Sequence, residues 1–178
     1  MLEIRKATEA DKPEIWKIIK SVISGGDTYP FAPDSGEEEM LAFWFGAGKW
    51  TYVAVWSEPP ALAGGLNDES DGLNGKIVGT FFLKANQPGL GSHIANAGYM
   101  VASEAKGKRV GRRMAEFSLE EARRLGFRAM QFNFVVKSNE IAVRLWQDIG
   151  FEIIGEIPEA FQHKEHGLTN ALIMYRKL

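Results

Sequence analysis

A cationic segment punctuated by glycines precedes a helical pattern in the second half of the chain. Residues 106–113 read Lys-Gly-Lys-Arg-Val-Gly-Arg-Arg, with five cationic side chains among eight residues. A glycine turn at a helix start presents backbone N–H groups that lack helical partners, together with the positive end of the helix dipole. Such an arrangement binds phosphate groups. The segment therefore predicts an anion site, and the alternatives are a solvated basic helix start or a weak nucleic-acid patch.

Three asparagines stand where a side-chain amide needs a partner. Asn96 and Asn133 fall within two expected strands, and Asn139 directly precedes an expected helix. Asn is disfavoured inside strands, and an amide among apolar neighbours must hydrogen bond or cost stability. For Asn96 and Asn133 a binding role is weighed against pairing with nearby backbone and slightly favoured. For Asn139 the simpler explanation is a helix N-cap.

Composition narrows the class of protein. The chain has 178 residues, and we expect a single domain over residues 1–178. The absence of cysteine excludes a thiol nucleophile, disulfides, thiolate zinc sites and iron–sulfur ligation. The formal charge of −2 argues against a nucleic-acid binder. Because there is no apolar run of membrane-spanning length and no secretory signal pattern, we expect a cytoplasmic protein.

Apolar periodicity and turn residues predict the elements that must position these groups. Strands are expected at residues 2–7, 51–56, 76–85, 93–102, 128–136, 151–157 and 168–177. Helices are expected between residues 8 and 24, 35 and 45, 110 and 125, and 139 and 149. Residues 57–75, rich in Pro, Gly and Asn, predict a long, mobile hairpin connection. This order indicates a mixed α/β domain around one sheet.

The order of strand, basic turn, helix and strand, followed by Asn139-Glu-Ile-Ala-Val-Arg-Leu-Trp-Gln-Asp-Ile-Gly-Phe151, resembles the GNAT superfamily of N-acetyltransferases. In that family an Arg/Gln-x-x-Gly-x-Gly/Ala turn grips the pyrophosphate of acetyl-CoA. Here Lys106 stands in the first slot, Arg109 in the first Gly slot and Gly111 in the last. The resemblance covers nearly the whole chain.

The resemblance implies a single, mostly antiparallel central sheet that is flanked by helices and splayed between its fourth and fifth strands. Acetyl-CoA would enter this wedge, and backbone N–H groups near Met100 and Val101 would bind its thioester carbonyl. No metal is expected, since His163 and His166 fit solvated loop residues better than ligands. The residues implied to contact the cofactor are Met100, Val101, Lys106, Gly107, Lys108, Arg109, Val110, Gly111, Arg112, Asn139 and Trp146.

Trp146 occupies the slot where many relatives carry a tyrosine that protonates the leaving thiolate. An indole N–H donates a hydrogen bond but is no general acid near neutral pH. Core packing is the favoured explanation of Trp146. Tyr175, water, or direct departure of the thiolate stay open as routes.

The positions of the three asparagines also resemble the pattern of one branch of this superfamily, the fungal N-acetyltransferases of proline analogues such as azetidine-2-carboxylate. That resemblance implies that Asn96 and Asn133 hold a small acceptor, with Tyr99 at an aromatic position of the branch. It also implies a catalytic role for Asn133 and Asn139, the latter at the cofactor or the reacting carbonyl. The segment 25–33, with Thr28 and Tyr29, would sit over the acceptor end.

These observations predict an acetyl-CoA-dependent N-acetyltransferase that acts on a small amine by direct attack in a ternary complex. Without cysteine, an acetyl-cysteine intermediate is excluded. The alternatives are a protein or polyamine N-acetyltransferase of the same fold, or a non-catalytic CoA-binding regulatory domain. A homodimer is possible by the same resemblance, and neither nucleic acid nor membrane is expected as a partner.

Overall fold

The computed structural model describes residues 1–57 and 75–178 of the chain. The expected hairpin connection at 57–75 therefore lies outside the described residues, apart from its two ends. The strands are β1 (Leu2–Lys6), β2 (Lys49–Trp56), β3 (Lys76–Ala85), β4 (Ile94–Val101), β5 (Ala129–Val136), β6 (Glu152–His163) and β7 (Gly167–Lys177). The helices are α1 (Lys12–Ile23), α2 (Glu37–Trp44), α3 (Val110–Arg124) and α4 (Glu140–Asp148), joined by short 3₁₀ turns.

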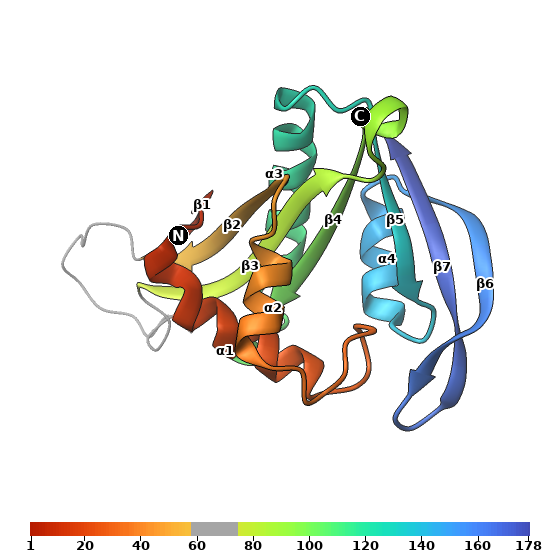
Figure 1. Cartoon of the computed structure of the whole chain (residues 1–178), viewed down its shortest axis with the longest axis horizontal. Coiled ribbons are helices and arrows are strands. Elements are labelled where there is room, and N and C mark those ends of the chain that lie inside the picture. The colour runs from red at the N-terminus through yellow and green to blue at the C-terminus, as the bar shows by residue number, and fades with distance from the viewer. Residues whose placement is uncertain (58–74) are drawn as a thin grey trace.

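The strands form one sheet in the order β1-β2-β3-β4-β5-β7-β6, and β4–β5 is its parallel pair. That pair holds through only two registered positions, Ile94 opposite Ala129 and Ala95 opposite Met130. From Asn96 onward β4 and β5 separate, as Figure 1 shows. The expected splayed, mostly antiparallel sheet flanked by helices is confirmed.

Each face of the sheet has its own helices and its own core. On the face of α2, the Trp44 indole donates to Thr80 Oγ1 at 2.9 Å and packs edge-on against Phe82. On the face of α3, the ring of Tyr52 stacks on Phe81 with centroids 4.8 Å apart. Figure 1 accordingly shows α2 in front of the sheet and α3 behind it. Burial of these aromatic rings supplies much of the energy that fixes the sheet between its helices.

A capped 3₁₀ turn, Glu9–Asp11, leads into helix α1. The Thr8 N–H donates to Asp11 Oδ2 at 2.7 Å, which is one half of a capping box, and Pro13 lies in the first turn. Arg5 of β1 holds the same carboxylate with two hydrogen bonds of 2.8 Å. These bonds lower the pKa of Asp11 and tie the helix start to the edge of the sheet.

The C-terminal hairpin differs from the sequence-based expectation. Strand β6 runs to His163, six residues beyond the expected end at residue 157. His163 is buried, and its Nδ1 accepts hydrogen bonds from the backbone N–H groups of Glu165 and His166. The expectation of a solvated loop histidine was therefore wrong for His163. Within residues 1–57 and 75–178, no helix has the length and apolar character that spanning a membrane requires.

Candidate functional site

The side chain of Asn96 closes the apex of the gap between β4 and β5. Its amide nitrogen donates to the backbone carbonyl of Gln131 at 2.8 Å, one residue beyond the last registered pair. That carbonyl belongs to the first part of β5 that has left β4, so the side chain replaces a missing ladder bond. Asn96 thus sets where the gap begins, and half of its amide N–H capacity stays available.

Strand alternation decides which backbone groups of β4 face the gap. The bonds from Ala102 N to Val78 O and from Asn86 N to Ile94 O direct the even-numbered positions of β4 toward β3. Met100 therefore has its N–H turned away from the gap, which corrects the expectation that this N–H meets a thioester. Tyr99 and Val101 present their backbone groups to the gap instead.

Tyr29 reaches into the gap from the segment between α1 and α2. Its hydroxyl donates to the backbone carbonyl of Tyr99 at 3.0 Å. Gly98 makes room for this approach, because a Cβ there would lie 3.1 Å from the Tyr29 hydroxyl and 2.7 Å from Phe82 Cε1. Burial raises the pKa of Tyr29 above its ordinary value, so the hydroxyl keeps its proton and acts as a donor.

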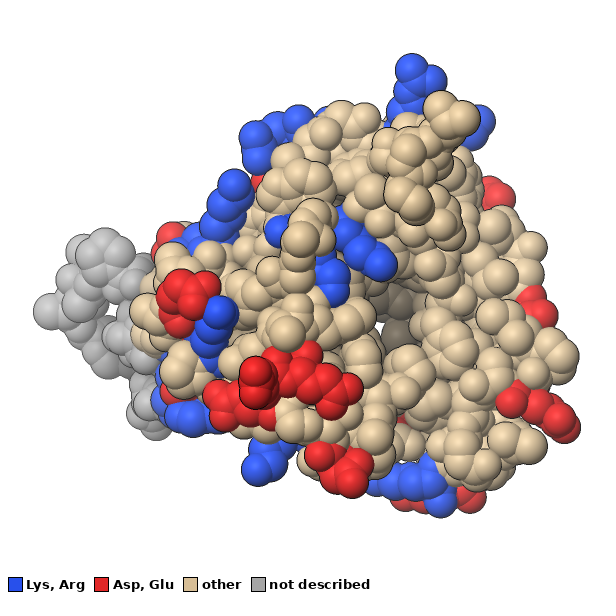
Figure 2. Space-filling model, viewed as in Figure 1, with Lys and Arg blue, Asp and Glu red and all other residues tan. Residues whose placement is uncertain are grey.

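Aromatic rings line the α2 face around this hydroxyl. The Tyr29 ring stacks on Phe31 with centroids 5.7 Å apart, and Phe31 meets Phe43 edge-on at 5.0 Å. Phe43 in turn lies 5.8 Å from Phe82 of β3. Figure 2 shows this face of the molecule hollowed between the regions of α2 and α4. Thr28 belongs to the same segment and is half-buried.

Asn133 lies on an irregular part of β5 and is exposed. The register between β5 and β7 shifts between Phe132 and Val135, which marks a bulge. The Asn133 amide donates to Asn86 Oδ1 at 2.6 Å and accepts from the Gln131 amide at 2.8 Å. Asn86 and Gln131 therefore join Asn133 in a chain of amides beside the gap. Sequence reasoning missed both, since a lone amide in a turn or strand gives no distinguishing signal.

Asn139 is the N-cap of α4. Its Oδ1 accepts from the backbone N–H of Ala142 at 3.2 Å. The capping explanation therefore accounts for this side chain, and the structure gives no separate support for a catalytic role.

Tyr99 and Trp146 have their side chains on the other face of the sheet. The Tyr99 hydroxyl lies 2.6 Å from Ser118 Oγ on α3, and its ring lies 5.0 Å from the Trp146 ring. Trp146 also packs against Phe132 at 4.6 Å and is buried. Both rings are thus core groups between the sheet and α3 and α4. The structure does not bring the Tyr99 ring together with Asn96 on the α2 face.

The turn before α3 has the backbone that a phosphate cradle needs. The first helical hydrogen bond there runs from Arg113 N to Arg109 O at 3.1 Å, so the N–H groups of residues 110–112 precede it. Gly107 has φ +79°, and nothing lies within 4 Å of the position of an added Cβ. Gly111 lies where β4 and α4 meet α3, 3.7 Å from Val101 and 3.8 Å from Leu145 by the same measure.

The cations of this turn divide into two groups. Lys106, Arg109 and Arg113 are exposed beside the cradle, Lys108 is half-buried, and the side chain of Val110 belongs to the core. Arg112 instead pairs with Asp148 of α4 at 2.7 Å. Open backbone, exposed cations and a helix N-terminus together fit a diphosphate.

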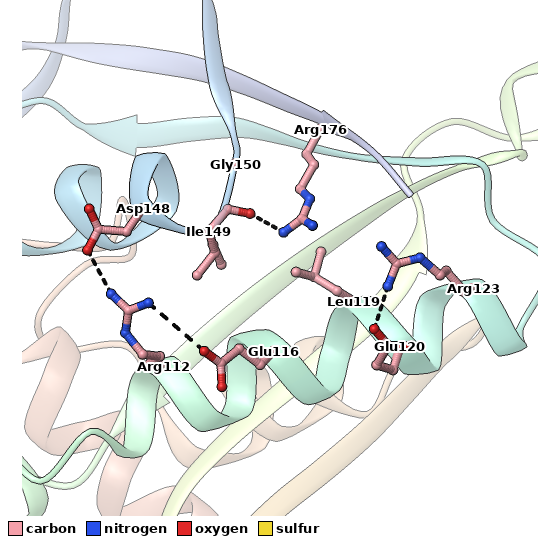
Figure 3. Close-up of a pocket in the computed structure, with 9 residues that line it drawn as sticks. All are labelled: Arg112, Glu116, Leu119, Glu120, Arg123, Asp148, Ile149, Gly150 and Arg176. Carbon is pink, nitrogen blue, oxygen red and sulfur yellow. Dashed lines mark hydrogen bonds and ion pairs between the residues drawn. The ribbon is translucent and has the colours of Figure 1, made fainter.

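Arg112 borders a shallow pocket of about 440 Å³ between α3 and the end of α4. Its charges largely neutralise one another, as Figure 3 shows for the pairs Arg112–Asp148 and Arg123–Glu120. The lining residues are Arg112, Glu116, Leu119, Glu120, Arg123, Asp148, Ile149, Gly150 and Arg176. This pocket therefore differs in character from the open cationic cradle. Among the described residues no group of three or more His, Asp or Glu could hold a metal ion.

A mixed sheet that opens between two parallel strands, with a cationic helix start at the opening, defines the acyl-CoA N-acyltransferase fold. Residues 30–151 match the Acetyltransferase (GNAT) family. The chain belongs to this family and is an N-acetyltransferase.

Two similar proteins support this assignment, and a third shows the shared fold. N-acetyltransferase aca1 of Schizosaccharomyces pombe is 34% identical over 152 residues, which are 85% of this chain and 72% of that protein. A GCN5-related N-acetyltransferase from Kribbella flavida superposes with a TM-score of 0.85 at 38% identity, covering 99% of this chain and 98% of that one. The acetyltransferase yncA from Salmonella typhimurium, solved with its cofactor acetyl-CoA, has a TM-score of 0.79 at 20% identity, covering 100% and 94% of the two chains.

Proposed function

We propose that this enzyme transfers the acetyl group of acetyl-CoA to the amine of a small acceptor, held in the gap between β4 and β5. The observation that carries the proposal is the gap itself, which opens from Asn96 and has the cationic turn 106–111 at its other end. A ligand with a diphosphate at one end and a reactive thioester at the other matches this arrangement. The similarity to yncA, which was solved with acetyl-CoA, supports it.

The turn 106–111 would hold the diphosphate. Backbone N–H groups at the start of α3, with Gly107 and Gly111 allowing close approach, would supply the hydrogen bonds. Lys106, Lys108 and Arg109 would add charge, whereas Arg112 would contribute through its pair with Asp148 by fixing α3 to α4. Tyr99 and Val101 would offer backbone groups to the pantetheine arm and the thioester.

The α2 face of the gap would hold the acceptor. There the Tyr29 hydroxyl and the ring of Phe82 approach Gly98 of β4. The amides of Asn96 and Asn133 both hydrogen bond to Gln131 of β5. Amides bind a polar group without adding charge, and aromatic rings suit a compact apolar body. We therefore propose a small amine, in particular an amino acid or a proline analogue such as azetidine-2-carboxylate.

Acetyl transfer would proceed by direct attack of the acceptor amine. The chain has no cysteine to carry an acetyl group. Trp146 is a packed core residue, and an indole is no acid near neutral pH. The Tyr29 hydroxyl, which keeps its proton, donates to the gap-facing carbonyl of Tyr99. The cytoplasmic location and the homodimer stay predictions of the sequence.

The test is release of free thiol from acetyl-CoA with a panel of amines that includes azetidine-2-carboxylate, compared with Gly111→Glu and Gly111→Ala. The glutamate would place bulk and negative charge in the cradle, and we expect loss of coenzyme A binding. The alanine would make only ordinary contacts of 3.7 and 3.8 Å, and we expect near-normal binding. Unchanged affinity in Gly111→Glu would contradict the proposed site, and saturable coenzyme A binding without turnover of any amine would favour a regulatory domain.

A further inference from the structure

A row of polar side chains crosses the sheet and ends at the apex of the gap. Lys49 of β2 lies opposite Lys84 of β3, and Lys84 lies opposite Asn96 of β4. Directly opposed residues of antiparallel strands share one face of the sheet. The Lys49 ammonium lies 3.4 Å from the centroid of the Phe43 ring on α2, which places the row on the α2 face.

The two lysines lie together without a counter-charge. Neither forms an ion pair with an acid of residues 1–57 or 75–178. Like charges directly opposite on a sheet are destabilising. Burial and the charge of Lys84 both lower the pKa of Lys49, to about 8. Figure 2 shows basic side chains gathered over this part of the face, beside the hollow.

The roles of the two lysines differ. The Lys49 ammonium donates to the carbonyl of Phe43 and lies 4.7 Å from the Phe82 ring centroid, so part of its function is to hold the end of α2. Lys84 makes no such bond to the described residues and stands between Lys49 and Asn96. Lys84 is therefore the cation that could bind a ligand at the apex of the gap, beside Asn96.

The neighbouring row defines what lies next to this charge. Phe82 is opposite Gly98, and Gly98 is where the Tyr29 hydroxyl approaches β4. An acceptor in the hollow would meet aromatic rings along this row and cationic and amide groups along the next. A molecule with an amine, a compact apolar body and an anionic group matches both rows.

We infer that Lys84, supported by Lys49 and Asn96, binds the carboxylate of the acceptor, and that the acceptor class is therefore α-amino acids rather than simple amines or polyamines. This inference rests on the proposed function, since it assigns one end of the same acceptor site. It adds a cationic pair to the asparagines, and neither lysine carries a signal in the sequence.

The experiment compares an amino acid with its primary amide. We would measure KM and kcat of the wild type and Lys84→Gln with azetidine-2-carboxylate and with its amide at saturating acetyl-CoA. The decisive quantity is the ratio of KM in Lys84→Gln to KM in the wild type, taken for each substrate separately. The amine of the acid and the amine of the amide differ in basicity, but this difference is the same for both proteins and cancels in the ratio. Lys76→Gln, an exposed lysine at the other end of β3, is the matched control.

We expect Lys84→Gln to raise KM for the carboxylate about 10-fold or more, as loss of a charge-assisted hydrogen bond does. KM for the amide and for acetyl-CoA should stay within about twofold of wild type, the Lys76→Gln control should match the wild type throughout, and Lys84→Arg should recover most of the loss. An equal rise for acid and amide, or no rise for either, would overturn the inference.

Failure of the proposed function has a different signature. If the wild type acetylates no amine, calorimetric titration with N-acetylproline in the presence of coenzyme A still tests the anion site. Binding that is weakened by Lys84→Gln and kept by Lys76→Gln supports the site without the activity. Absent binding, or equal binding by all three proteins, rejects it.

Discussion

The hydroxyl of Tyr29 donates to the backbone carbonyl of Tyr99 across the open side of β4, with 3.0 Å between the two oxygens. The two residues are 70 positions apart, and the bond ties the segment between α1 and α2 to the strand that borders the gap. Gly98 permits this bond, because a side chain there would collide with Phe82 and crowd the hydroxyl. The segment between α1 and α2, which we propose borders the acceptor, is thus anchored to the strand that borders the gap.

We predict that Tyr29→Phe lowers the free energy of unfolding by about 1 kcal/mol, since one side-chain hydrogen bond is lost while the ring stays packed. It should also raise KM for the acceptor and leave the affinity for coenzyme A nearly unchanged. Urea unfolding and steady-state kinetics measure the two effects. Tyr175→Phe is the control for stability alone, because the Tyr175 hydroxyl makes no hydrogen bond to the described residues but stays open as a proton route. A Tyr29→Phe variant with wild-type stability and KM would show that the Tyr29–Tyr99 hydrogen bond does not hold the segment between α1 and α2 in place.

The second prediction concerns the stability of variants at Asn96, at the apex of the gap. Asn96→Ala leaves the Gln131 carbonyl without its partner and should cost about 1–3 kcal/mol of stability. Asn96→Asp should cost more, because it sets a carboxylate oxygen against that carbonyl. Asn133→Ala, at an exposed position, should stay within about 0.5 kcal/mol of wild type. If Asn96→Ala unfolds like the wild type and only KM for the acceptor changes, Asn96 serves the ligand and not the gap.

The lowered pKa of Glu121 makes the stability of the fold depend on pH. The Arg124 guanidinium, at 2.6 Å, and the Tyr52 hydroxyl, at 2.5 Å, hold the pKa of this buried carboxyl at about 2, below its ordinary 4.5. The unfolded chain therefore takes up the proton at a higher pH than the folded chain. The stabilisation is complete above pH 4.5 and is lost as the pH falls toward about 2.

Glu121→Gln should accordingly lower stability at pH 7 by on the order of 1–2 kcal/mol and flatten its decline in acid. Thermal unfolding of both proteins between pH 7 and pH 2 gives the difference curve, which removes the parallel contribution of Asp11. A difference that does not shrink as the pH falls below the ordinary glutamate pKa would contradict this account.

Local patterns in the sequence predicted the elements that depend on local chemistry. The expected strand 76–85 coincides with β3, because an apolar run between turn residues leaves little freedom. The cap at Asn139 was likewise predicted from residue type and position. The family resemblance supplied the splayed sheet, since no local pattern says which two strands are parallel.

What the sequence did not show depends on contacts between distant segments. The sequence predicted an uninterrupted strand over residues 128–136, but the shifted pairing with β7 puts a bulge beside Asn133. The partner of Asn96 is a backbone carbonyl 35 residues away, so no neighbouring residue announces it. Lys49 and Lys84 are likewise joined only by the register of β2 and β3.

Arg109 is the N-cap of α3 and has φ 60° and ψ 14°, in the left-handed region. A side chain pays about 1–2 kcal/mol for this conformation, and glycine avoids most of that cost. This explains why glycine is usual in this slot of the family's turn. Arg109 therefore combines a strained backbone with an exposed cation beside the cradle.

We predict that Arg109→Gly raises the free energy of unfolding by about 0.5–1 kcal/mol, after the greater flexibility of glycine in the unfolded chain is subtracted. The same change should weaken coenzyme A binding, because one cation is lost. Lys106→Gly is the matched control: Lys106 has φ −60° and ψ 142°, so its replacement removes a cation and relieves no strain. Opposite signs of the stability change in the two variants, with weaker binding in both, are the expected result of urea unfolding and calorimetry. If Arg109→Gly is less stable than the wild type, the left-handed backbone of Arg109 does not destabilise the protein and the prediction is wrong.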